Sequence, residues 1–388
     1  PNSPMPIMDL RNGKDELQFL KRNDLEELST RGTASPDHVI RIKGRPLVLR
    51  ESVWSQGREA IKEELDKYAE EYKAMFERQA PQADQPKTML PTDPKNIWME
   101  GIGLIGLGAN AKAASIAGDL VVQNARVRAI GEDAGGFRPI SEKDLFDCEY
   151  WSLEQAKLGK GAPPKFQGKI VMITGGSGTI GFAIAKAFSK LGAQTILVDK
   201  DEIALKESVA KLGVGHKYFP IDVTHSDAAN QAMLAAINNF GGLDILISNA
   251  GAAHAGPMLD ISNEELRNAF ELNFFSHYSF STEAAKILKD QNRGGQILFN
   301  ISKQAVNPGK NFGAYGLPKA TTFFLMRQLA LELGSDGIRV NGINADRIRS
   351  GLLTDEFISS PAKSRGVSES EYMACLLYTS DAADELRS

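Results

Sequence analysis

From Gly168 onward, short apolar segments alternate regularly with helix-like segments. Helices are expected between the apolar segments, for example at residues 180–191 and 314–333. The expected strands cover residues 169–173, 195–199, 217–221, 243–249, 296–301 and 338–343. Strand–helix repetition predicts a parallel sheet covered on both faces, and right-handed crossovers then give a Rossmann-type, doubly wound α/β fold.

The part of the chain before Gly168 is organised differently. Residues 52–79 are expected to form one long charged helix, because apolar side chains recur at helical spacing among acidic and basic ones. Residues 80–94 contain four prolines and are typical of a linker, and a small αβ segment follows from residue 96 to about 158. We therefore expect boundaries that separate residues 1–95, 96–164, 165–374 and 375–388.

The C-terminal residues 375–388 match one reading frame of a transposon-end sequencing adapter. We expect this stretch to be an assembly artefact, with a natural polar tail as the alternative. No function is inferred from Cys375 or the residues after it. The chain also begins with Pro1 and not with Met, so we expect its natural start to be missing.

Composition and charge exclude several classes of partner. A net charge of −4 over 388 residues indicates neither a nucleic-acid nor an anionic-membrane partner. Two cysteines, Cys148 and Cys375, argue against a disulfide framework and fit a reducing, cytoplasmic compartment. No apolar run reaches the roughly 18 residues that a membrane span needs. A small-molecule substrate is therefore expected.

A glycine-rich turn follows the first expected strand. Gly175, Gly178 and Gly181 have the spacing that lets a backbone turn tightly and lets a pyrophosphate approach N–H groups at a helix N-terminus. A purely structural turn is the alternative for such a triad on its own. The expected cofactor-binding residues of the turn are Gly175, Ser177, Gly178, Thr179, Ile180 and Gly181.

The second expected strand ends at Asp199, 24 residues after Gly175. A carboxylate there can accept hydrogen bonds from both hydroxyls of the adenosine ribose and would repel a 2′-phosphate, which favours NAD over NADP. A solvated aspartate at a strand end is the alternative. The expected adenine- and ribose-binding residues at the next two strand ends are Asp222, Val223, Asn249, Ala250 and Gly251.

A second glycine motif lies earlier in the chain. Gly101, Gly103 and Gly106 match the Gly-x-Gly-x-x-Gly pattern literally. No strand ending in an acidic residue follows at the required distance, because Asp119 comes too soon and lies in a helix-like stretch. We therefore expect a structural turn here.

Ser302 and the pair Tyr315 and Lys319 form the expected proton-transfer site. Tyr315 and Lys319 are four residues apart and so share a helix face, and Pro318 between them is tolerated only near the helix start. The tyrosine pKa is expected to fall from about 10 toward the working pH, because a nearby ammonium and a nicotinamide favour the phenolate. Ser302 would bind the substrate oxygen, Lys319 would also reach the nicotinamide ribose, and Asn273 would hold a water linked to Lys319.

On these residues, positions from about 166 to 374 resemble the short-chain dehydrogenase/reductase family. There are two departures from the commoner family pattern. Thr179 stands where a glycine is usual, and Asn344-Ala-Asp346 stands where Pro-Gly is usual. The resemblance places Ser350 where a hydroxyl side chain meets the carboxamide of the cofactor.

Residues 31–41, 150–158 and 341–351 resemble a two-function family, in which a class II aldolase of the rhamnulose-1-phosphate type is fused to a short-chain dehydrogenase. The resemblance implies that residues 1–95 are the end of the aldolase domain, that residues 96–164 connect the two parts, and that the dehydrogenase oxidises lactaldehyde in rhamnose catabolism. The aldolases hold a metal with three histidines, two of them as His-x-His. The five histidines here include no His-x-His, so no metal site and no aldolase activity are expected, and His38 is expected to be structural.

Aldehyde oxidation through a thiohemiacetal needs a cysteine nucleophile, and none accompanies these residues. An aldehyde is therefore expected to react as its hydrate, by the same steps as a secondary alcohol. A polyol or sugar(-phosphate) dehydrogenase is the first alternative. The second alternative is a non-catalytic NAD-binding module or an inactive fragment, since no seventh strand is evident in the sequence. The full-length protein is expected to be a homo-oligomer.

Overall fold

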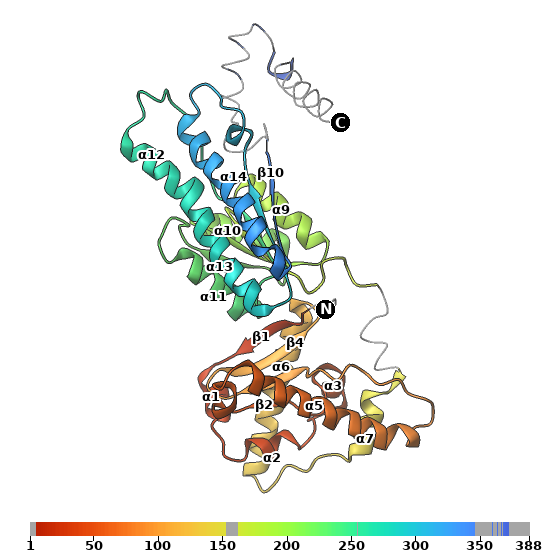
Figure 1. Cartoon of the computed structure of the whole chain (residues 1–388). Coiled ribbons are helices and arrows are strands. Elements are labelled where there is room, and N and C mark those ends of the chain that lie inside the picture. Colours follow the sequence, from red (N-terminus) through yellow and green to blue (C-terminus); the bar gives the residue numbers. More distant parts are fainter. Residues whose placement is uncertain are drawn as a thin grey trace. The chain divides into compact units, whose positions relative to one another are not determined.

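The computed structural model describes residues 5–152, 162–253 and 255–345, and isolated positions between 359 and 371 (Figure 1). The chain divides into two compact units, one formed mainly by residues up to Lys169 and the other mainly by residues after it. Across these described residues, no helix combines the length and the apolar character that a membrane crossing requires.

The second unit contains a six-stranded sheet in the order β10-β9-β8-β5-β6-β7. Its strands are β5 (Ile170–Thr174), β6 (Gln194–Asp199), β7 (Lys217–Pro220), β8 (Ile245–Ser248), β9 (Gly295–Asn300) and β10 (Ile338–Ile343). The recorded pairings are parallel, and the central strand β5 is fully buried, as expected for a sheet covered on both faces. The predicted doubly wound α/β fold is confirmed, and each predicted strand is present within two residues of its expected ends.

Helices connect these strands (Figure 1). They are α9 (Thr179–Lys190), α10 (Glu202–Leu212), α11 (Ala228–Phe240), α12 (Asn263–Phe270), α13 (Ser276–Gln291) and α14 (Gly313–Leu333). A π-helical turn, Glu271–Phe275, joins α12 to α13. Helices α13 and α14 lie side by side and both contact the sheet, so residues far apart in the sequence meet beside the ends of β8 and β9.

The first unit has a four-stranded sheet in the order β1-β4-β3-β2. Its strands are β1 (Ile7–Arg11), β2 (Leu47–Leu49), β3 (Asn96–Met99) and β4 (Gly103–Gly108). Two of them come from the expected connecting segment and two from the segment before it, so both segments contribute to one sheet. A buried cluster that includes Leu25, Ile42 and Trp98 forms its core.

Helix α6 (Ala111–Asp133) packs closely on β4. A Cβ atom on Gly106 would lie 2.2 Å from the backbone nitrogen of Gly118. Gly101, with a φ of 77°, lies in the turn between β3 and β4. The early glycine motif therefore permits a hairpin turn and close helix–strand packing.

The prediction of one helix over residues 52–79 is wrong. The structure has α4 (Glu51–Trp54) and α5 (Arg58–Gln79), separated at Gly57, whose φ is 101°. A backbone with this positive φ cannot continue a right-handed helix, and glycine adopts it without a Cβ penalty. The remaining helices of this unit are α1 (Lys14–Phe19), α2 (Leu25–Ser29), α3 (Pro36–Ile42) and α7 (Glu142–Glu149).

Candidate active site

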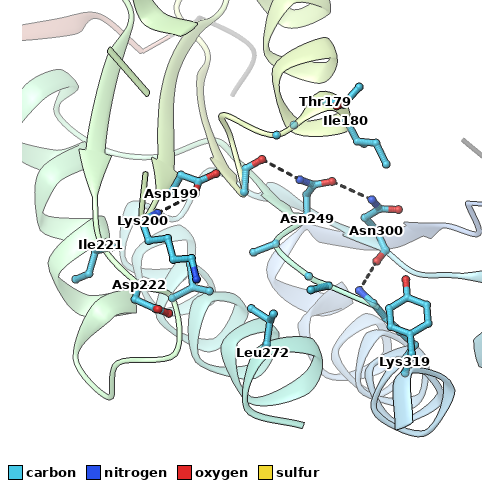
Figure 2. A pocket seen from close by; sticks show the side chains of 18 residues that line it. Thr179, Ile180, Asp199, Lys200, Ile221, Asp222, Asn249, Leu272, Asn300 and Lys319 are labelled. Atoms are coloured by element: carbon cyan, nitrogen blue, oxygen red, sulfur yellow. Dashed lines mark hydrogen bonds between the residues drawn. The ribbon is translucent and has the colours of Figure 1, made fainter. Parts of the chain in front are cut away.

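A cavity of about 400 Å³ lies at the carboxyl ends of the parallel strands, where β5 and β8 are neighbours (Figure 2). The strand order reverses at this point, and doubly wound sheets bind ligands in such a crevice. The lining includes many of the residues predicted from the sequence: Gly175, Gly178, Thr179, Ile180, Gly181, Asp199, Asp222, Val223, Asn249, Ala250, Gly251, Tyr315 and Lys319. The predicted Ser350 lies outside the described residues.

The glycine turn joins β5 to α9 beside this cavity. Gly175 has a φ of 63°, and a Cβ atom on Gly181 would lie 2.1 Å from the Gly175 carbonyl oxygen. A side chain is therefore excluded at these two glycines, and the backbone can approach a ligand at the N-terminus of α9. This cradle fits the pyrophosphate of a dinucleotide.

Asp199 is the last residue of β6 and lies at the opposite end of the cavity from Lys319 (Figure 2). Its Oδ2 accepts hydrogen bonds from the hydroxyl of Ser177 at 2.6 Å and from the Ser177 backbone nitrogen at 3.3 Å. Its Oδ1 accepts one from the backbone nitrogen of Lys200 at 2.8 Å. Ser177 thus contacts the carboxylate instead of lining the cavity, and the carboxylate is held against the glycine turn.

Asp222 follows β7, and Val223 beside it is buried. Hydrogen bonds from the backbone nitrogen and the hydroxyl of Thr224 reach Asp222 Oδ1 at 3.0 and 2.7 Å. The backbone hydrogen bond is the main cause that lowers the pKa of Asp222. The Asp222 carboxylate is therefore charged at neutral pH, and the hydrogen bonds from Thr224 fix its orientation.

A chain of amide hydrogen bonds connects the glycine turn to the far end of the cavity (Figure 2). Asn249 Nδ2 donates to the Thr174 carbonyl at 2.9 Å, and Asn300 Nδ2 donates to Asn249 Oδ1 at 2.9 Å. The carbonyl of Asn300 in turn accepts from Lys319 Nζ at 3.0 Å. The Asn249 amide both donates and accepts, and Asn300 donates through its side chain and accepts through its backbone carbonyl, so these hydrogen bonds link the ends of β5, β8 and β9 to Lys319.

Tyr315 and Ser302 form a hydrogen-bonded pair. Tyr315 lies in the first turn of α14, as predicted, and is 8% exposed. Burial raises the pKa of Tyr315, and the hydrogen bond with Ser302 acts in the opposite direction. The protein's own groups therefore raise this pKa, because desolvation of the phenolate outweighs the hydrogen bond; the expected lowering depends also on the nicotinamide and stays a prediction.

Lys319 is 2% exposed, and burial lowers the pKa of its amine to about 7. Its Nζ lies 5.9 Å from the centre of the Tyr315 ring. Besides the Asn300 carbonyl, it contacts Nε2 of His277 at 3.3 Å. Burial, together with the Lys319 charge, lowers the pKa of His277 well below its ordinary value, while a hydrogen bond with the Ala250 backbone acts in the opposite direction.

Asn273 lies in the π-helical turn and is buried. Its Nδ2 donates to the carbonyls of Ala252 and Ala269 at 3.0 and 3.1 Å, and its own carbonyl accepts from the Thr322 hydroxyl at 2.7 Å. Its Oδ1 has no hydrogen-bond partner among the described residues. A Cβ on Gly251 would lie 2.8 Å from this oxygen and 3.4 Å from Lys319 Nζ, so the amide lies near the amine.

Several lining residues were not predicted from the sequence: Lys200, Ile221, Ala252, Leu272 and Asn300. Asn300 could have been predicted as a site residue, because it is a polar residue at the end of a strand predicted from the sequence. His277 could also have been predicted, because it follows Asn273 by four residues and so lies on the same helical face.

His38 makes structural contacts in the first unit. Its Nδ1 is 2.6 Å from the Ser35 hydroxyl, its Nε2 is 3.1 Å from Gln123 Oε1, and burial lowers its pKa. Over the ranges that the structure describes, no group of three or more His, Cys, Asp or Glu side chains is arranged to hold a metal ion.

Comparison with known proteins relates each unit to a family. Residues 169–358 match the family described as short chain dehydrogenase, and residues 2–158 match the family described as aldolase class II, second domain. The uncharacterized oxidoreductase YuxG of Bacillus subtilis is 31% identical over 89% of this chain and 51% of its own length, so this chain spans about half of that relative. The 7alpha-hydroxysteroid dehydrogenase of Escherichia coli is 34% identical over 46% of this chain and 71% of its own length.

A solved short-chain type dehydrogenase/reductase from Mycobacterium marinum is 32% identical over 48% of this chain and 75% of that chain, with a TM-score of 0.46. Through residues 169–358 the chain belongs to the short-chain dehydrogenase family, as its identity with the Escherichia coli enzyme shows. This part of the chain has the α/β fold of that family, whose members are oxidoreductases that use NAD or NADP.

Proposed function

We propose that this chain is an NAD-dependent dehydrogenase that removes hydride from an alcohol or from the hydrate of an aldehyde. The observation that carries the proposal is one cavity with Asp199 at one end and Lys319, which lies beside the Tyr315–Ser302 pair, at the other. The glycine turn would hold the pyrophosphate, Asp199 the adenosine ribose, and Lys319 the nicotinamide ribose. When bound, NAD takes up the hydride from the substrate carbon.

Side chains of this protein would accept the proton that leaves the substrate hydroxyl. Ser302 Oγ would bind the substrate oxygen, and Tyr315 Oη would take the hydroxyl proton as the carbon–oxygen double bond forms. The Lys319 ammonium favours the phenolate that accepts this proton. One hydroxyl proton and one hydride leave the substrate, so a secondary alcohol gives a ketone and an aldehyde hydrate gives a carboxylic acid.

Lactaldehyde, oxidised to lactate in rhamnose catabolism, is the substrate that we propose first. The observation that supports it is the aldolase class II match of residues 2–158. Oxidation through the hydrate needs no thiol. A polyol or sugar(-phosphate) dehydrogenase remains the alternative, because the same residues would oxidise a secondary alcohol. We further propose that the protein is a cytoplasmic homo-oligomer.

NAD binding and NAD reduction are to be measured separately on the full chain. We expect NAD to bind, and NADH to form when lactaldehyde is the substrate. Polyols and sugar phosphates are then tested as alternative substrates. Binding without reduction of NAD by any of these substrates would favour a non-catalytic NAD-binding module or an inactive fragment. Faster turnover with a polyol would replace the proposed substrate and leave the reaction class unchanged.

The coenzyme preference is expected to depend on the charge of Asp199. Asp199→Asn keeps the side-chain shape but removes the charge that would repel a 2′-phosphate, so the ratio of kcat/KM for NAD over NADP should fall by about tenfold. Asp201→Asn is the matched control, since Asp201 caps α10 through Ala204 and asparagine caps equally well. An unchanged ratio in Asp199→Asn would remove this aspartate from coenzyme selection.

A further inference from the structure

Lys319 is held in the interior by two acceptors on different elements. The Asn300 carbonyl, at the end of β9, lies 3.0 Å from Nζ, and Nε2 of His277, on α13, lies 3.3 Å from it. A buried ammonium has three N–H donors and is costly to bury without partners. Each of these two acceptors therefore affects both where the amine lies and how readily it holds a proton.

His277 is itself fixed from its other side. Its Nδ1 is 2.6 Å from the hydroxyl of Ser248, the last residue of β8, and the imidazole is 1% exposed. Ser248, His277 and Lys319 thus form a buried row of side chains from β8 through α13 to α14. Since an ammonium can only donate, Nε2 must accept whenever Lys319 is protonated, and Nδ1 then carries the proton toward Ser248.

On the basis of the proposed function, we propose that His277 is a positioning residue that holds Lys319 through a neutral imidazole, with the Ser248 hydroxyl as the partner of its other ring nitrogen. The imidazole contributes no charge to the cavity. It supplies an acceptor that stabilises the protonated amine and directs it toward the Tyr315 end of the cavity. While Lys319 is protonated, its ammonium keeps Nε2 as the acceptor, and the Ser248 hydroxyl accepts the proton of Nδ1.

The titratable groups near this amine are few. Tyr315 lies on the same helix, His277 faces Lys319 from α13, and the uncharged carbonyl of Asn300 faces it from β9. Removing the imidazole acceptor destabilises the ammonium, so the Lys319 amine loses its proton at lower pH. The alkaline limb of the pH profile of kcat/KM should therefore move to lower pH.

Three variants test this role. His277→Leu removes the acceptor, and we expect kcat/KM for NAD reduction to fall about tenfold at neutral pH, with the alkaline limb shifted about one unit to lower pH. His277→Gln keeps an acceptor oxygen and should restore the limb to within about half a unit. His216→Gln is the matched control, because His216 is also buried and bonded to Ser189 and Thr195, yet does not line the cavity.

A second measurement uses the protein without cofactor. Imidazole ¹⁵N shifts, assigned to His277 by comparison with His277→Gln, should report a neutral ring with its proton on Nδ1 below the pKa of Lys319. A proton on Nε2, or a pH profile lowered in His277→Leu without movement of the alkaline limb, would overturn the proposal. Failure of the unaltered chain to reduce NAD would instead overturn the proposed function, while the tautomer result would still decide the contact with Lys319.

Discussion

Tyr315→Phe is expected to lower the rate of NAD reduction by about 10³-fold while leaving NAD affinity within about twofold. The substitution removes only the phenolic oxygen, which is hydrogen-bonded to Ser302. The other ionisable groups at this end of the cavity are Lys319 and His277, which are buried and engaged with each other. Neither can replace the hydroxyl at the substrate oxygen, so proton transfer should fail while the binding surface persists.

Tyr278→Phe provides the control for this substitution. Tyr278 lies on α13, is 47% exposed and is not part of the cavity lining, so activity should stay close to that of the unaltered chain. NADH formation and NAD binding are measured on both variants. Activity of Tyr315→Phe within tenfold of the unaltered chain would remove the tyrosine from proton transfer. Loss of NAD binding in the same variant would indicate a disturbed cavity instead.

The strands of the second unit were predictable because each is a short apolar run bounded by polar or glycine residues. The first unit was harder, since its sheet pairs β1 with β4 and β2 with β3, strands that are far apart or separated by helices. Local periodicity contains no information about such pairing. The break at Gly57 was missed because helical spacing continues on both sides, and a single glycine is often tolerated within a helix.

Only some residues of the site could be predicted from the sequence. Asp199 and Tyr315 could be named because strand ends and helix spacing place them on the same crevice. The role of Asn300 and of His277 depends on contacts between different elements, which one-dimensional spacing does not reveal. The effect of burial on the Tyr315 pKa could not be predicted for a related reason: the charge of Lys319 is visible in the sequence, whereas the burial that raises the pKa is not.

Lys319→Met is expected to lower kcat/KM for NAD reduction by more than about 10²-fold. Methionine has a similar length, but it can neither donate to a ribose hydroxyl nor favour the Tyr315 phenolate. NAD affinity should fall too, which distinguishes this variant from Tyr315→Phe. Lys310→Met changes an exposed lysine outside the cavity lining and serves as the surface control.

The same variant should change how stability depends on pH. Burial lowers the pKa of the Lys319 amine from its ordinary 10.5 to about 7. Between these values the unfolded chain holds a proton that the folded protein has released, so the stability of the unaltered protein rises with pH relative to Lys319→Met. The difference in free energy of unfolding should increase by about 2 kcal/mol between pH 7.5 and 9.5. Denaturant unfolding of both proteins without cofactor measures this difference. A constant difference across the window would show that the amine keeps its proton when buried, and phenolate stabilisation by Lys319 would then extend to higher pH.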